Sequence, residues 1–86
     1  MKLNEAVRQL RKESGDTWQS FAWRHRMALT TVANYESGRM RPRTGKLIRF
    51  YLLADEIQSE TAAIFLDAIC QDVGGRIKIM GSHAAS

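Results

Sequence analysis

The sequence has little cysteine and proline and no long apolar run. It has one Cys and one Pro among 86 residues, and its apolar runs are far shorter than the ~18 residues of a membrane span. One Cys cannot form an intramolecular disulfide or supply the ligand set of a zinc finger. These absences exclude a disulfide-rich secreted mini-protein, a transmembrane protein and a zinc finger, and they make the cytoplasm the expected compartment.

Motifs of catalysis and cofactor binding are also missing. The sequence contains no Gly-rich phosphate loop, no pair of catalytic carboxylates and no hydrolase nucleophile motif. Cys70 has no basic neighbour that would activate it and is expected to be a small buried apolar residue. His25 and His83 have no second ligand at helical spacing. We therefore expect no enzymatic activity, no cofactor and no metal.

The charges divide unevenly along the chain. Residues 1–54 hold eleven Lys or Arg and four Asp or Glu, a net charge of +7, whereas residues 55–74 hold no Lys or Arg and five acids. Arg76 and Lys78 bring the whole chain to +4. A local basic charge is expected when one face meets a polyanion, so nucleic acid is a candidate partner, although Lys and Arg are also ordinary surface residues.

Apolar residues recur with the 3.6-residue period of α-helices almost throughout the chain. The predicted helices are one that Gly15 closes, one at about 18–25, one at about 28–36, one that follows Thr44, and one at about 60–73. Thr17, Thr44 and Ser59 are the expected N-caps. The residues expected to face the core are Leu3, Val7, Leu10, Phe21, Ala22, His25, Val32, Tyr35, Leu47, Ile48, Tyr51, Leu52, Ala62, Phe65, Leu66, Ile69 and Val73.

The C-terminal residues show a different pattern. Gly74 and Gly75 are expected to stop the last helix, and residues 76–80 alternate polar and apolar side chains as in a short strand. Residues 81–86 are small and are expected to be mobile. Because no linker divides the chain, we predict one all-α domain over residues 1–75, with a strand and tail at 76–86.

One stretch carries a family resemblance. Residues 31–42, TVANYESGRMRP, resemble the end of the recognition helix and the following loop in the Cro/phage-repressor (Xre-like) helix-turn-helix family. The resemblance covers about residues 3–54, and its specific part is the spaced set Ala22, Val32, Tyr35, Glu36, Gly38 and Pro42. It implies a compact five-helix, lambda-repressor-like domain in which two short helices are joined by a tight turn.

The resemblance implies that the helix at 28–36 enters the major groove of duplex DNA. Carried over position by position, the base-facing residues become Leu29, Thr30 and Asn34, with Thr31 nearby. Asn34 can pair with adenine, Thr30 can donate a hydrogen bond or touch a thymine methyl, and Leu29 offers apolar contact. This set favours an A·T-leaning site, although Asn34 can also be read as an ordinary solvated residue late in a helix.

Phosphate contacts are expected from two places. Arg39, Arg41 and Arg43 follow the recognition helix within five residues, and a guanidinium binds phosphate through its planar fork. Trp18 and Gln19 begin the preceding helix, where backbone N–H groups attract anions. The family usually has a phosphate-binding Gln at the position of Trp18, and a Trp there is as often a packing residue.

Other positions concern the scaffold of the motif. Glu36 lies at a helix end where the dipole disfavours an acid, so it needs a cation; Arg11 is the best candidate, and the family commonly has an Arg–Glu pair there. Arg26 stands where the family has a turn Gly, which costs roughly 1 kcal/mol if the residue is left-handed. His25 replaces a Leu, and Ala28 replaces a Ser or Thr cap. These departures from the family pattern affect the expected geometry of the turn more than the expected presence of the helix-turn-helix motif.

The helix at 60–73 has more apolar residues than one core-facing stripe requires, and the surplus around Ile64, Ala68 and Cys70 is a candidate dimer interface. The sequence thus predicts a repressor-like, sequence-specific regulator of transcription that binds double-stranded DNA as a homodimer, bacterial or phage-encoded and nucleoid-associated. An antitoxin-like or other protein-interaction module that uses the helix at 60–73, with DNA binding secondary, is the alternative. Non-specific DNA coating and RNA binding are further competitors.

Overall fold

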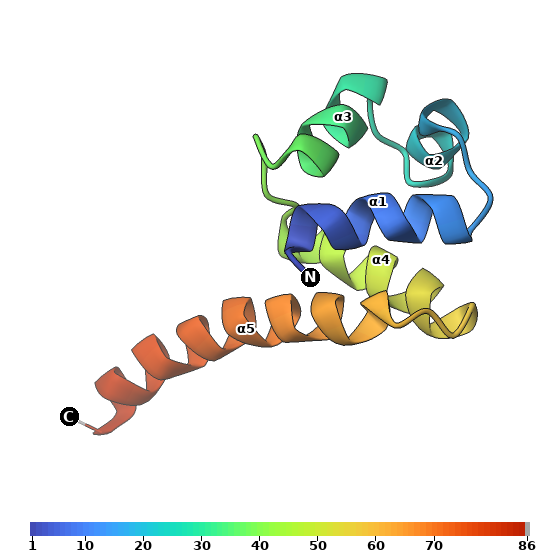
Figure 1. Ribbon diagram of the computed structural model, residues 1–86. Helices are drawn as coiled ribbons and strands as arrows, with labels where there is room; N and C mark the ends of the chain where they lie inside the picture. Colours follow the sequence, from blue (N-terminus) through green and yellow to red (C-terminus); the bar gives the residue numbers. More distant parts are fainter. Residues whose placement is uncertain (86) are drawn as a thin grey trace.

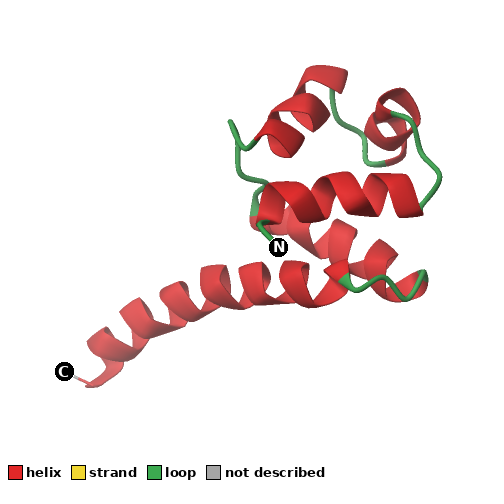
Figure 2. Cartoon of the chain, viewed as in Figure 1, coloured by secondary structure: helices red, strands yellow, loops and turns green. Residues whose placement is uncertain are grey.

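The computed structural model describes the backbone of residues 1–85 and the side chains of residues 1–74. Within that range the chain forms five α-helices and no strand (Figure 2). The helices are α1 (Leu3–Glu13), α2 (Trp18–Arg24), α3 (Leu29–Ser37), α4 (Thr44–Glu56) and α5 (Thr61–Ala85). The prediction of an all-α fold with five helices is confirmed.

The helices pack on both sides of α1. α2 and α3 lie on one side of α1, and α4 and α5 lie on the other (Figure 1). α4 packs most extensively against α5, and α5 also packs against α1. The later turns of α5 run away from the other helices, which gives the molecule its long axis of 50 Å against 26 and 21 Å (Figure 1).

Local signals fix most of the helix ends. The Ser20 backbone N–H donates to Thr17 Oγ1 at 3.1 Å, and the Thr17 N–H donates to Ser20 Oγ at 2.9 Å, so Thr17 caps α2 as predicted. Ser59 Oγ accepts a hydrogen bond from the first N–H of α5 at 3.1 Å. Gly15 and Gly38 follow α1 and α3 in the left-handed region, with φ of +77° and +82°.

Phe50 of α4 lies at the centre of an aromatic cluster. Its ring centroid is 5.5 Å from that of Phe21 in α2, 5.1 Å from His25, 6.3 Å from Tyr35 in α3 and 5.6 Å from Phe65 in α5. The surrounding core contains Ala6, Val7, Leu10, Phe21, Ala22, Val32, Tyr35, Leu47, Phe50, Leu53, Ala54, Phe65 and Ala68. One ring therefore joins four of the five helices.

The predicted inward face of α4 is partly wrong. Leu47 is buried as expected, but Ile48 and Leu52 are 43% and 59% exposed, and Phe50 occupies the core instead. Residues 47–54 are almost all apolar except for Arg49, so hydrophobic periodicity could not choose which side of this helix faces inward. Thr44 is also not the N-cap: Arg43 holds that position, and Thr44 is the first residue of α4.

Helix α5 shows the same kind of error. Phe65 is buried as predicted, but Leu66 and Val73 are 43% and 39% exposed. Ala68, which we assigned to a surface surplus, is buried in the core, and Cys70, which we expected to be buried, is exposed. The broad apolar circumference of this helix hid the phase of its core-facing stripe.

The predicted strand at 76–80 is wrong, because these residues belong to α5, which continues to Ala85. Gly74 and Gly75 do not stop the helix. A helical Gly costs about 1 kcal/mol relative to Ala, but each added residue of an existing helix also gains a backbone hydrogen bond. The expected mobile tail at 81–86 lies in α5 up to Ala85, and residue 86 lies outside the described residues. Among the described residues, no helix combines the length and the apolar character needed to cross a membrane.

His25 is a buried titratable group inside the aromatic cluster. Its side chain is 3% exposed, and within the described chain neither ring nitrogen has a hydrogen-bond partner. Burial, together with the nearby cations Arg49, Arg24 and Lys46, lowers the pKa of His25 from 6.5 to about 4. His25 is therefore neutral in the folded protein at neutral pH.

This burial predicts a pH-dependent stability. The unfolded chain takes up a proton at His25 near pH 6.5, whereas the folded chain does so only near pH 4. Stability contributed by neutral His25 is thus complete above pH 6.5 and is lost as the pH falls toward 4. We expect the free energy of unfolding to drop by about 2 kcal/mol between pH 7.5 and 5. Urea denaturation at the two pH values measures it, and His25→Leu should remove most of the drop; an equal drop in both proteins would contradict the assignment.

Candidate nucleic-acid interface

The outer side of α3 carries the residues predicted for base readout. Leu29 is 43% exposed, Thr30 is exposed, and Thr31 and Asn34 are half-buried. The opposite side of the helix is anchored in the core, where Val32 and Tyr35 are 0% and 6% exposed; burial also raises the pKa of the Tyr35 hydroxyl. Helical spacing places Thr30 and Asn34 on the side that turns away from these anchors.

The connection between α2 and α3 is a tight turn with a left-handed residue. Arg26 has φ of +53°, in the left-handed region, so the condition under which the sequence predicted a strained turn is met. The Met27 N–H donates to the Ala22 carbonyl at 2.9 Å, which closes the turn. Ala28 is the N-cap of α3 and makes no side-chain hydrogen bond there. The backbone of the turn is thus held by its own hydrogen bonds, without a capping side chain.

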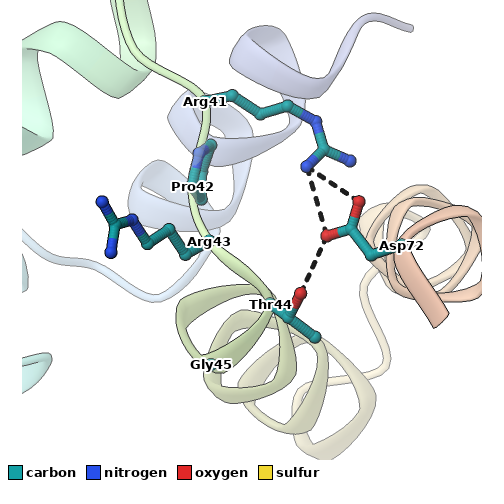
Figure 3. Close-up of a pocket in the computed structure, with 6 residues that line it drawn as sticks. All are labelled: Arg41, Pro42, Arg43, Thr44, Gly45 and Asp72. Atoms are coloured by element: carbon teal, nitrogen blue, oxygen red, sulfur yellow. Dashed lines mark hydrogen bonds and ion pairs between the residues drawn. The ribbon is translucent and has the colours of Figure 1, made fainter. Parts of the chain in front are cut away.

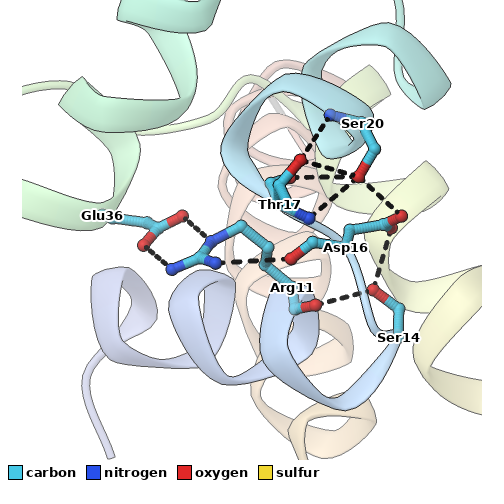
Figure 4. Close-up of polar contacts among 6 residues, drawn as sticks. All are labelled: Arg11, Ser14, Asp16, Thr17, Ser20 and Glu36. Carbon is cyan, nitrogen blue, oxygen red and sulfur yellow. Dashed lines mark hydrogen bonds and ion pairs between the residues drawn. The ribbon is translucent and has the colours of Figure 1, made fainter.

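Arg11 and Glu36 form the ion pair expected from the sequence. Arg11 Nε donates to Glu36 Oε2 at 2.8 Å, and Arg11 Nη2 donates to Oε1 at 3.1 Å (Figure 4). The two side chains are 14% and 6% exposed. Arg11 Nη1 also donates to the Asp16 carbonyl at 3.4 Å, so this bidentate pair ties α1 to both the last turn of α3 and the start of α2.

Asp16 organises the start of α2, a role that our sequence reasoning missed. Its carboxylate accepts hydrogen bonds from Ser14 Oγ and Ser20 Oγ, each at 3.0 Å (Figure 4). Arg24 Nε lies 3.1 Å from the same carboxylate. The signal that could have revealed it is the run of turn and capping residues at 14–17, Ser-Gly-Asp-Thr.

The two residues predicted for phosphate binding on α2 are both accessible. Gln19 is exposed, and Trp18 is 45% exposed. The Trp18 ring also lies under the guanidinium of Arg11, 5.8 Å from its centroid, and lines a shallow hollow with Ala33 and Ser37 of α3. Trp18 therefore packs against the ion pair while one side of it remains open beside α3.

The three arginines after α3 have different surroundings. Arg39 and Arg43 are exposed and make no ion pair within the described part of the chain. Arg41 is tied to α5 instead: its Nη1 lies 3.1 Å from Asp72 Oδ1 and 3.2 Å from Oδ2 (Figure 3). Thr44 Oγ1 donates to Asp72 Oδ2 at 2.9 Å. The Asp72 carboxylate of α5 thus binds Arg41 and Thr44 at the start of α4, where a phosphate could otherwise bind. No pattern in the sequence linked these distant residues.

Basic side chains of α4 gather at the C-terminal end of α2. Lys46 Nζ donates to the His25 carbonyl, and Arg49 Nη2 donates to the Arg24 carbonyl at 3.4 Å, so cations of α4 meet the carbonyl end of α2. Burial lowers the pKa of Lys46, as do Arg49 and Arg26. Beside this cluster lies Trp23, which is 85% exposed.

Comparisons with known proteins identify no relative: no family model, no curated protein and no solved structure matches the chain. Among the described residues, no group of three or more His, Cys, Asp or Glu is placed to hold a metal ion. The functional interpretation therefore rests on the surface of α3, the adjoining arginines and their surroundings.

The left-handed turn predicts a stabilising substitution. We expect Arg26→Gly to raise the free energy of unfolding by about 1 kcal/mol, because Gly adopts positive φ without the steric cost that a Cβ imposes. Arg26→Ala is the matched control, since it removes the same charge but keeps the Cβ. Urea denaturation at pH 7.5 compares the three proteins. A glycine variant no more stable than the alanine variant would show that the turn is unstrained.

Proposed function

We propose that this chain is a repressor-like regulator of transcription that binds double-stranded DNA sequence-specifically, as a member of the Cro/phage-repressor family. In this proposal α2 and α3 form the helix-turn-helix, and α3 enters the major groove. The observation that carries the proposal is the division of α3: Val32 and Tyr35 anchor it in the core, whereas Leu29 and Thr30 are exposed and Asn34 is half-buried.

The outward residues supply a chemically sensible reading set. The Asn34 amide can donate to N7 and accept from N6 of adenine, Thr30 can bond to a base edge, and Leu29 can contact a thymine methyl. Thr31 is half-buried beside them, at the edge of this surface. The combination supports an A·T-leaning site, because neither a guanidinium nor an ammonium group lies among these four side chains to bind guanine.

Affinity would come mainly from the phosphates. Arg39 and Arg43 are exposed directly after α3, and Trp18 and Gln19 are accessible at the start of α2. Such contacts release counterions, so binding should weaken steeply as salt rises. We infer that the protein acts as a homodimer on two half-sites, and that it works in the cytoplasm on the nucleoid of a bacterium, encoded by the chromosome or by a phage.

A second candidate function is favoured by the exposed apolar side chains of α5. Leu66 and Val73 are 43% and 39% exposed on a helix that extends beyond the rest of the fold. An antitoxin-like or other protein-interaction module would use this helix to hold a partner, with DNA binding secondary. The two functions differ in what the isolated protein does with duplex DNA.

Selection from a random duplex pool, followed by fluorescence anisotropy near physiological salt, tests the DNA proposal. We expect the selected duplex to bind at least a hundredfold more tightly than its scrambled counterpart, a difference of about 2.7 kcal/mol or more. Asn34→Ala should cost about 1–3 kcal/mol at one base position, whereas Gln71→Ala on exposed α5 should cost nothing. Equal, weak binding to both duplexes would indicate non-specific coating, and no binding would favour the protein-interaction function.

The contact between Arg41 and Asp72 gives a sharper prediction for the same assay. A carboxylate that holds Arg41 competes with a phosphate for the same guanidinium. Asp72→Asn should therefore tighten DNA binding severalfold and should steepen the slope of log K against log salt concentration by about one. Asp67→Asn, an exposed acid of the same helix, measures the general effect of removing one negative charge. Equal gains in the two variants would show that Asp72 does not compete, and weaker binding would show that it positions Arg41.

A further inference from the structure

An exposed tryptophan lies beside a hollow at the end of α2. Trp23 is 85% exposed, more than any other large apolar side chain of the described residues. The hollow has a volume of about 570 Å³, within the range of roughly 300–1,000 Å³ that small-ligand pockets occupy. Six residues line it, namely Ala22, Trp23, Arg24, Arg26, Met27 and Arg49. The main apolar element of the hollow is therefore one indole ring.

The rest of the hollow is cationic. Arg24, Arg26 and Arg49 line it from α2, from the following turn and from α4. Arg24 is already paired, because its Nε lies 3.1 Å from Asp16 Oδ2. Arg26 and Arg49 are exposed and form no ion pair within residues 1–74. Since no acid is among the described residues that line the hollow, two guanidiniums remain available to an anion.

The cations around the hollow are close enough to repel one another. Burial, and after it Arg49 and Arg26, lowers the pKa of Lys46, as expected when guanidiniums lie near an ammonium group. Arg26 also has the left-handed backbone that favours Gly, and its N–H donates to the Trp23 carbonyl at 3.2 Å. Crowded like charges and a strained residue are unfavourable for folding, and both are features expected of a binding site for an anion.

We propose that this hollow binds a nucleoside diphosphate, with the base stacked on Trp23 and the phosphates held by Arg26 and Arg49. A flat aromatic ring that carries negative charge matches the two kinds of group in the hollow. An indole binds a base by stacking on its face, whatever the base, and a guanidinium binds a phosphate through its planar fork. The two phosphates of the ligand correspond to the two guanidiniums that have no acidic partner in the described chain.

The hollow suits a small ligand better than a protein partner. A stable protein interface uses about 20–30 residues on each side, whereas six residues line this hollow. A bound peptide needs a strand edge or an apolar groove with several pockets, and this hollow offers one exposed ring. The same base and phosphate chemistry occurs in a free nucleotide and in an unpaired nucleotide of a single strand. The proposal does not depend on the binding of duplex DNA.

Isothermal titration calorimetry with ADP, in the absence of DNA, tests the site. The wild-type protein is expected to bind one ADP per chain with a Kd of about 0.1 mM, as suits an open surface site. Trp23→Ala and Arg26→Ala should each weaken binding about fivefold or more. Arg8→Ala is the matched control, because it removes the same charge as Arg26→Ala from an exposed position on α1. Since all three side chains are exposed, these changes leave the core intact. Absence of binding at millimolar ADP, or equal weakening by the two arginine variants, would overturn the proposal.

Further probes in the same assay define the ligand. Adenosine lacks the phosphates and pyrophosphate lacks the ring, so each should bind about tenfold more weakly than ADP. An oligodeoxyadenylate separates the two sources of a nucleotide. Much tighter binding of the strand, lost in Trp23→Ala, would assign the hollow to an unpaired nucleotide, and binding no tighter than that of ADP would assign it to the free one; both support the proposal. Pyrophosphate that binds as tightly as ADP, or tighter binding of the acidic peptide EEFEE, would overturn it.

Discussion

The packing around Phe50 is the constraint on which the rest of the fold depends. Its ring contacts aromatic side chains of α2, α3 and α5, namely Phe21, Tyr35 and Phe65, at centroid distances of 5.5, 6.3 and 5.6 Å. Tyr35 is one of the two residues that anchor α3, so the orientation of the candidate reading surface is set by a residue of a different helix. Loss of that ring would leave a cavity shared by four helices, which a chain of 86 residues with a small core can poorly tolerate.

The two ends of α3 are held in different ways, by a side-chain ion pair at its last turn and by backbone hydrogen bonds at its start. At its last turn, Glu36 is paired with Arg11 in a bidentate, largely buried contact, which supplies the cation that the helix dipole demands. At its start, Arg26 accepts a left-handed conformation and Ala28 offers no cap. The helix is thus fixed firmly at its end and by backbone alone at its beginning, where Leu29 and Thr30 lie. The start of α3, which carries the candidate base-contacting residues Leu29 and Thr30, therefore has a slightly lower local stability, as is common at functional sites.

Sequence patterns predicted the parts of the structure whose physics is local. The Thr17 cap, the end of α1 at Gly15, and the helices themselves follow from side chains close to one another in the chain. The inward phase of α4 did not, because apolar residues surround that helix and the choice of Phe50 over Leu52 depends on the other helices. The Arg11–Glu36 pair was predicted from the helix dipole at Glu36 together with the family resemblance. The contact of Asp72 with Arg41 joins residues 31 apart without any local signal.

Helix α5 connects the core of the fold with the arginine loop that follows α3. Successive residues, Asp72 and Val73, have different surroundings: the carboxylate meets Arg41 and Thr44 at the start of α4, and the valine is 39% exposed. Phe65 and Ala68, two turns and one turn earlier, secure the same helix to the core. Because a helix moves as a rigid rod, any displacement of α5 would also move the carboxylate of Asp72 that holds Arg41. The position of α5 would thereby set the charge presented beside α3, while α1 to α3 keep their packing.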